Sequence, residues 1–241
     1  MLMAQKLQHQ YFKMESKLIN YINDSFESIG FNAQKSVGKL QFHYNNSNSN
    51  LLVKAQCNIR FHTNGTIYFE SISSSIYFLD AGIFFSRIAN EADATGLKYR
   101  DDNTVGINSR VIKKVSTTDV FEILNFERRL HFQNTADFKN VFEDQLSKIA
   151  SVYCSNVDFI AIISKELDRI EFSELSYFFG KHTVFIKSYF LKKQSYQKHI
   201  EYNQYLEKHT QSLYDDFMQN QLPSEANSIK NFYRIFVDEI A

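Results

Sequence analysis

A run of alternating residues at 51–78 constrains the fold of this chain more than any other stretch. From Leu51 to Phe61 every second residue is apolar, and all but one of the residues between them are polar. Alternation with a period of two is the pattern of a β-strand that buries one face. Asn64-Gly65 follows, and this pair favours a type I′ turn, which needs positive φ at both central residues. The stretch therefore predicts a long antiparallel hairpin closed by a two-residue turn.

The register that such a turn imposes separates the two ends of the hairpin. Away from the turn, the apolar residues of both strands share one face. Near the turn, Ile67 comes opposite His62, on the polar face. Phe69 likewise comes opposite Arg60, which would make a cation–π contact with it. Something must cover these two apolar side chains, and we expect either another part of the same chain, such as a C-terminal helix, or a partner, or a second copy of the chain.

A further strand predicted at Lys39–Tyr44 extends the hairpin into a meander. The polar loop that follows it would pair Phe42 with Val53. All three strands then share one apolar face, which helices must cover. The segment from Leu7 to Ile29 has apolar residues three and four apart, so it predicts a helix, which Gly30 would end.

The rest of the chain is mainly helical in pattern. Helices are expected at 80–96, 118–130, 135–152, 167–180, 194–222 and 224–240, and strands at 108–115, 157–163 and 182–191. A helix is the alternative for 157–163. The predicted fold class is α+β, an antiparallel β-meander packed against helices, with a helix-rich C-terminal third.

A chain of 241 residues can bury a sizeable core in one large domain or in two small ones. No long linker or internal repeat divides it. The part after 133 is predicted to hold too few strands for a sheet of its own. We therefore expect a single α+β domain over 1–241, in which 1–132 would form a meander lobe and 133–241 a mainly helical lobe.

The charge balance gives no reason to expect a nucleic acid or a membrane as the partner. Lys and Arg total 27, as do Asp and Glu, so no net charge attracts polyanions. No apolar run reaches the length of about 18 residues that a membrane helix needs, and residues 1–10 lack the apolar centre of a secretory signal. We expect a soluble, cytoplasmic protein without a membrane partner. Delivery into another cell stays open.

The composition supports neither ligand stacking by aromatic rings nor a fold held by disulfides. Lys, Asn, Ile, Phe and Tyr have AT-rich codons, and their abundance is typical of a bacterial or phage-like composition. The 23 Phe and 14 Tyr are therefore no evidence for ligand stacking. Two cysteines, Cys57 and Cys154, do not form a disulfide framework.

The sequence lacks the short motifs that mark common catalytic and metal sites. It contains no Cys-x-x-Cys, His-x-x-x-His or Gly-x-Ser-x-Gly, and no glycine-rich phosphate loop. Asp168, Glu171 and Glu174 are three residues apart, a spacing more typical of a solvated helix face than of paired catalytic carboxylates. We therefore expect no metal and no cofactor, and we assign no catalytic residue.

The leading functional hypothesis is a non-enzymatic protein-binding protein, of an inhibitor, immunity, adaptor or contact-acting effector type. It depends on the absence of a catalytic motif and on the two-faced tip of the hairpin. The partner would be another protein or a second copy of the chain. The predicted contact residues are Arg60, His62, Ile67 and Phe69.

Two alternatives stay open. One is a hydrolase or transferase that uses His62, His182 and scattered carboxylates, because many active sites assemble from residues far apart in sequence. The other is a nucleic-acid-binding protein. Its support is the mixture of lysines and an aromatic residue at Lys187, Tyr189, Lys192 and Lys193, as in surfaces that bind single strands.

Overall fold

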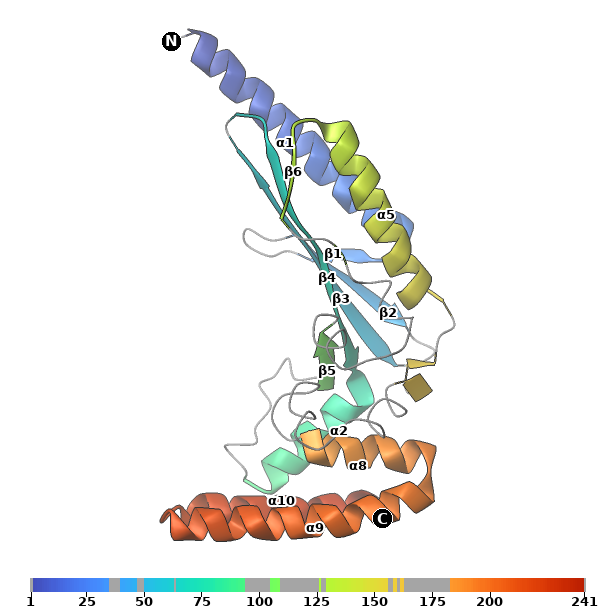
Figure 1. The fold of residues 1–241 in the computed structure, drawn as a ribbon, viewed down its shortest axis with the longest axis vertical. Helices are drawn as coiled ribbons and strands as arrows, with labels where there is room; N and C mark the ends of the chain where they lie inside the picture. The colour runs from blue at the N-terminus through green and yellow to red at the C-terminus, as the bar shows by residue number, and fades with distance from the viewer. Residues whose placement is uncertain are drawn as a thin grey trace. The chain divides into compact units, whose positions relative to one another are not determined.

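The computed structural model describes residues 2–34, 40–46, 50–62, 64–93, 105–108, 126, 129–155, 158–159, 161–162 and 183–240 (Figure 1). An antiparallel sheet packs against helices, and the C-terminal region is helical, which confirms the α+β class. The chain splits into two compact units. Unit 1 combines Met1–Ile76 with Asn108–Val157, and unit 2 combines Tyr77–Ile107 with Asp158–Ala241.

The predicted meander is the centre of the sheet. The strands are β1 (Asn32–Gln34), β2 (Leu40–Asn46), β3 (Leu51–Phe61), β4 (Ile67–Phe78), β5 (Val105–Asn108) and β6 (Leu130–Phe132). The described helices are α1 (Leu2–Ser28), α2 (Leu79–Glu91), α5 (Thr135–Tyr153), α8 (Thr183–Gln194), α9 (Tyr196–Gln219) and α10 (Pro223–Ile240). The strand order is β1-β2-β3-β4-β5, and β6 also pairs with β4.

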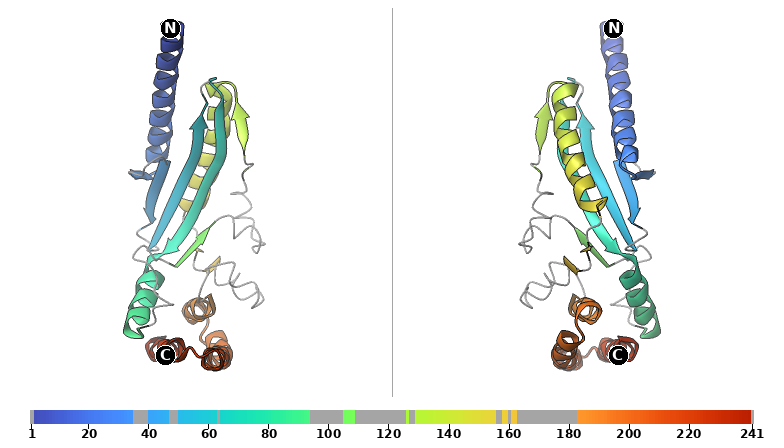
Figure 2. Two further views of the ribbon diagram at one scale, coloured as in Figure 1. Left: turned by 90° about the vertical axis from the view of Figure 1, so that its left-hand side faces the viewer. Right: turned by 90° about the vertical axis from the view of Figure 1, so that its right-hand side faces the viewer.

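In unit 1, α1 and α5 cover one face of the sheet (Figure 2). The Phe26 ring of α1 stacks on Phe42 of β2, with the ring centroids 3.8 Å apart. The Phe69 ring of β4 meets Phe138 of α5 edge to face at 5.3 Å. The two helices also touch, through Phe26 and Phe142. Each of these rings is fully buried, and burial of one Phe side chain contributes about 1.5–3 kcal/mol.

The register of β2 against β3 differs from the prediction by two residues. Phe42 lies opposite Ala55 rather than Val53. A shift of two keeps every side chain on its expected face, because the side-chain period of a strand is two. The shift also places Leu40, the first residue of β2, opposite Cys57.

The turn between β3 and β4 is not the predicted type I′ turn. The N–H of His62 donates to the carbonyl of Thr66 at 3.0 Å, and the N–H of Gly65 donates to the carbonyl of His62 at 2.9 Å. Of the predicted turn pair, only Gly65 has a positive φ, at 88°. His62 therefore pairs with Thr66 instead of Ile67, and the register near the tip shifts by one residue.

A bulge in β4 follows this shifted tip. Ser71 has a φ of 111°, and both Ser71 and Ile72 are buried, whereas burial alternates on either side of them. An extra residue of this kind turns the side chains after it to the other face of the strand. Ile67 and Phe69 therefore share the helix-covered face with the buried residues beyond the bulge. The prediction that they lie on the polar face is wrong for this reason.

Polar side chains of α5 pair with the bulged part of β4. The N–H of Ile72 donates to the side-chain oxygen of Gln145 at 3.0 Å, and Gln145 is 3% exposed. The hydroxyl groups of Ser74 and Tyr153 lie 2.8 Å apart. These bonds are needed because a buried donor without an acceptor costs about 1–3 kcal/mol.

We expect Gln145→Leu to lower the free energy of unfolding of unit 1 by about 1–3 kcal/mol, because it leaves the N–H of Ile72 buried without an acceptor. Urea denaturation measures this change, and the amide of Ile72 should exchange its hydrogen faster. Asn140→Leu is the matched control, since Asn140 is an exposed residue of the same helix, and it should change stability by less than about 0.5 kcal/mol. Equal effects of the two substitutions would contradict this role of Gln145.

Among its described residues, unit 2 packs α2, α8 and α10 around aromatic rings. Phe85 of α2 stacks with Phe236 of α10 at 5.9 Å, and Phe185 of α8 lies 5.3 Å from Phe236. Arg87 of α2 makes two hydrogen bonds to the carboxylate of Glu239 in α10, of 2.7 and 2.8 Å. This bidentate pair is exposed to solvent, so it contributes less to stability than the rings.

Thr183–Gln194 forms the helix α8 where a strand was predicted at 182–191. Three consecutive residues, Val184, Phe185 and Ile186, are buried. A helix with neighbours on several sides buries adjacent residues. Its apolar residues then occupy both odd and even positions, as they do in a strand that is buried on both faces. The sequence pattern does not separate these two cases.

Two shorter segments also differ from the preferred prediction. The N–H of Ile162 donates to the carbonyl of Asp158 at 3.1 Å, a helical bond where a strand was preferred and a helix was the alternative. Leu130–Phe132 is the strand β6 rather than the end of a helix. Most of the predicted strand at 108–115 and helix at 118–130, and all of the helix at 167–180, lie outside the described residues.

A buried polar cluster joins α8 to α9. The hydroxyl of Ser188 donates to Oδ1 of Asn203 at 2.7 Å, and it lies 3.2 Å from Nδ1 of His199. Nδ2 of Asn203 lies 3.0 Å from Nε2 of His199. Burial lowers the pKa of His199 below its usual 6.5; a backbone hydrogen bond at Ser188 acts against this shift, and the charge of Lys192 adds to it.

Acidification should therefore destabilise unit 2. Below about pH 6.5 the unfolded chain binds a proton at His199 that the folded chain binds only at lower pH, so the free energy of unfolding falls as the pH drops. His199→Gln should flatten this dependence in thermal unfolding measured between about pH 6.5 and 5. Some slope should persist, because burial also lowers the pKa of His209. If the stability of the variant depended on pH as steeply as that of the wild-type chain, this role of His199 would be contradicted.

Candidate functional site

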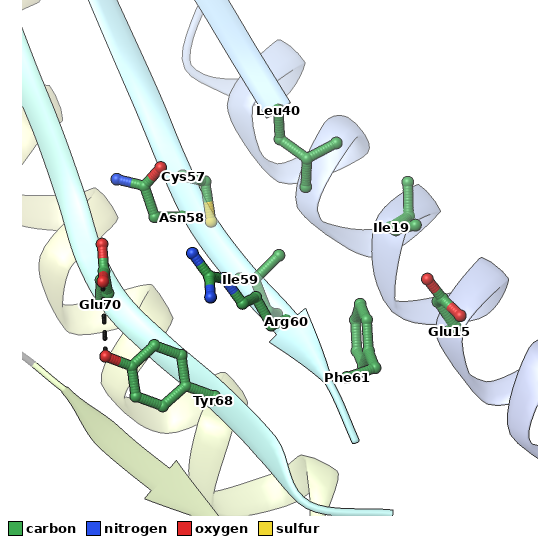
Figure 3. A pocket seen from close by; sticks show the side chains of 10 residues that line it. All are labelled: Glu15, Ile19, Leu40, Cys57, Asn58, Ile59, Arg60, Phe61, Tyr68 and Glu70. Carbon is green, nitrogen blue, oxygen red and sulfur yellow. Dashed lines mark hydrogen bonds between the residues drawn. The ribbon is translucent and has the colours of Figure 1, made fainter. Parts of the chain in front are cut away.

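A pocket of about 400 Å³ opens in unit 1 beside the end of β3 (Figure 3). Its walls come from α1, the start of β2, the end of β3 and the start of β4. Ten residues line it: Glu15, Ile19, Leu40, Cys57, Asn58, Ile59, Arg60, Phe61, Tyr68 and Glu70.

The pocket lies where β3 continues past β2. Among the described residues, the pairing of these strands ends at Leu40 opposite Cys57, and β3 runs on to Phe61. We call Asn58–Phe61 the β3 edge. Backbone groups along an antiparallel strand point alternately to its two sides. Because the N–H of His62 donates to the carbonyl of Thr66, the residue before β4, the backbone groups of Ile59 and Phe61 point away from β4, toward the side of the pocket.

The β4 side of the same hairpin tip is covered. β6 pairs there with β4, with Tyr68 opposite His131 and Phe69 opposite Leu130. An uncovered strand edge is a template on which another strand can pair, and most proteins cover or shorten such edges. In the part of the chain that the structure describes, the tip has a neighbouring strand on its β4 side and none along the β3 edge.

Charged and apolar side chains alternate along the β3 edge. Ile59 and Phe61 are half-buried, and in Figure 3 they point toward α1. Arg60 is exposed and has no ion pair with any described residue. On the neighbouring strand, the hydroxyl of Tyr68 donates to Glu70 at 3.4 Å. The arrangement offers backbone hydrogen bonds, an apolar contact and a guanidinium group to one ligand.

The structure separates the four predicted contact residues into two pairs. Arg60 lines the pocket, and His62 is exposed at the turn. Ile67 and Phe69 are 0% exposed, so they form no contact surface. Phe138 of α5 covers the Phe69 ring, so the cover is another part of the same chain, as one of the three expectations had it, although the covering helix is α5. Phe69 lies on the helix-covered face of β4, away from the exposed Arg60, so the predicted cation–π contact does not form.

The residues considered for an enzyme do not meet in the described part of the chain. His62 does not line the pocket. His182 and the acidic residues at 168, 171 and 174 lie outside the described residues. Within the described ranges, no three His, Cys, Asp or Glu side chains are grouped so that they could hold a metal ion.

The lysines considered for nucleic-acid binding belong to α8. The ammonium group of Lys187 lies 5.2 Å from the centre of the Tyr202 ring, and that of Lys193 lies 4.9 Å from the centre of the Tyr189 ring. These contacts occupy ring faces on which bases would have to stack.

Several residues that line the pocket were not among the predicted contact residues, although the sequence of β4 holds a signal for two of them. Apolar residues of β4 occupy odd positions at Ile67 and Phe69 and even positions from Ile72 onward. This change of parity indicates a bulge, which places Tyr68 and Glu70 on the face of the sheet opposite to α1 and α5. Among the described elements of unit 1 no helix covers this face, and we call it the open face. The residues from α1 carried no such signal, because their place depends on how the helix packs.

No protein-family model, curated protein or solved structure matches this chain. Among the helices that the structure describes, none has an apolar stretch long enough to span a lipid bilayer.

The two cysteines should differ in their reactivity. Cys57 lines the pocket but is 2% exposed, and burial raises the pKa of its thiol far above the usual value. Cys154 is exposed, although partial burial raises its thiol pKa as well. Because the thiolate is the reactive form, iodoacetamide should label Cys154 at least about tenfold faster than Cys57 in the folded protein. Peptide mass mapping measures both rates, and equal rates would show that solvent reaches Cys57.

Proposed function

We propose that this chain is a non-enzymatic protein-binding protein and that it binds an extended segment of a partner protein at the β3 edge. One observation supports the proposal: a strand edge without a neighbouring described strand coincides with a pocket of about 400 Å³. Extended peptides add a strand to exposed sheet edges in many complexes. Backbone hydrogen bonds then supply affinity, and pockets for alternate side chains supply selectivity.

The added strand would lie in line with β2, between the β3 edge and α1. Its backbone would bond to Ile59 and Phe61. Alternate side chains would point to the side of Ile19 and to the open face of the sheet. Stacking of Phe26 on Phe42 holds α1 against the sheet, so the proposed site would be formed before a ligand binds. A preformed site lowers the entropy cost of binding. An inhibitor, an immunity protein or an adaptor would each use such a contact.

Selection from a library of displayed random peptides, with the full chain as bait, tests this function. We expect peptides that slow amide hydrogen exchange at Ile59 and Phe61 by at least about tenfold at saturation, because exchange requires the new hydrogen bond to open. The amide of Arg60 points toward β4 and should change little. The proposal fails if no peptide is selected, or if the selected peptides protect amides of unit 2 instead.

A substitution at the edge supplies the control. Ile59→Pro removes the N–H that points to the edge and should weaken the selected peptides at least about tenfold. Ile59→Val keeps this N–H and should leave the dissociation constant within about twofold. Circular dichroism and the exchange pattern of α5 show whether the proline variant stays folded. Equal affinity of the two variants would place the peptide elsewhere.

A further inference from the structure

We propose that the partner segment carries an acidic residue between two apolar residues, with the acidic residue opposite Arg60. The inference rests on the proposed function and names the chemistry of the segment that the β3 edge accepts. It follows from which side chains share each face of the edge and from which charges there already have partners.

An added strand must match the alternation of β3. Residues directly opposite each other on neighbouring strands share one face of the sheet, and their neighbours on either side share the other face. The residue opposite Arg60 would therefore lie on the open face. Its two neighbours would lie opposite Ile59 and Phe61, on the face toward α1. A pattern of one central residue and two like neighbours reads the same in both directions, so it holds for parallel and antiparallel addition.

The face toward α1 favours apolar side chains. Ile19, Ile59 and Phe61 are each half-buried around the pocket. Two apolar side chains on the added strand would remove the exposed parts of these three from water. Glu15 is the charged residue of α1 that lines this wall, and its carboxylate disfavours an acidic side chain on the same face.

The open face favours an acidic side chain. Arg60 is exposed and has no ion pair among the described residues. Glu70 is on β4, on the other side of β3 from an added strand, and it accepts the hydroxyl of Tyr68. Asn58 accepts a hydrogen bond from Gln56. Opposite charges directly across neighbouring strands stabilise the pair and like charges destabilise it, so a carboxylate opposite Arg60 is preferred to an ammonium group.

Two synthetic peptides with neutral ends test the inference. One has the sequence Thr-Val-Glu-Val-Thr and the other Thr-Val-Lys-Val-Thr, and each is titrated into the full chain with amide chemical shifts as the readout. The wild-type chain should bind the glutamate peptide about three- to tenfold more tightly. Arg60→Glu should reverse this preference. Lys54→Glu is the matched control, because it reverses a charge of β3 that does not line the pocket, and it should keep the wild-type preference.

Each other outcome overturns a definite part of the inference. Equal binding of both peptides to the wild-type chain overturns the charge preference while strand addition stands. An unchanged preference in Arg60→Glu shows that a residue other than Arg60 interacts with the charged side chain of the peptide. If neither peptide binds, the proposed function fails together with the inference. If the chain sediments as a dimer that the peptides dissociate, a second copy occupies the edge, and a segment of another protein is ruled out as its regular occupant.

Discussion

In the described part of unit 1, the packing of the sheet against its helices depends on one extra residue in β4. Before the bulge at Ser71, the odd-numbered side chains of β4 face the helices, and after it the even-numbered ones do. A strand without the bulge would have to expose either Ile67 and Phe69 or the apolar residues near its other end. The bulge also directs Tyr68 and Glu70 to the open face, where they line the pocket. One local departure from regular pairing thus completes the core and shapes the candidate site.

The long hairpin is regular enough to be predicted, whereas its tip is not. Periodicity alone placed α1, β2, β3 and β4, and Gly30 ends α1 with a φ of 89°, as expected for a helix-ending glycine. Asn-Gly correctly marked the reversal but not its length, because a glycine with positive φ suits a longer loop as well. A shift of one residue in the turn changes every pairing near the tip. The sequence therefore predicts the two strands of the hairpin better than it predicts the register between them.

The candidate site could be predicted only in part, again because the register near the tip does not follow from the local sequence. Arg60 and His62 are exposed, as their polar character in a strand pattern suggests. Ile67 and Phe69 were assigned to the surface because the assumed register left them without cover, and α5 covers them. Such cover comes from tertiary packing between segments about 70 residues apart, which no local pattern encodes. The same is true of the pocket wall that α1 supplies.

The position of Arg60 bears on which strands the edge can accept. Backbone hydrogen bonding does not depend on sequence, so an apolar edge would pair with many strands, including the same edge of a second copy. Two copies paired antiparallel about Arg60 would bring the two guanidinium groups directly opposite each other, and like charges in this position are destabilising. The same group would stabilise a strand that presents a carboxylate there. A single exposed charge in the middle of the β3 edge would therefore disfavour self-association and favour the acidic segment that we propose, so the two effects would act in the same direction.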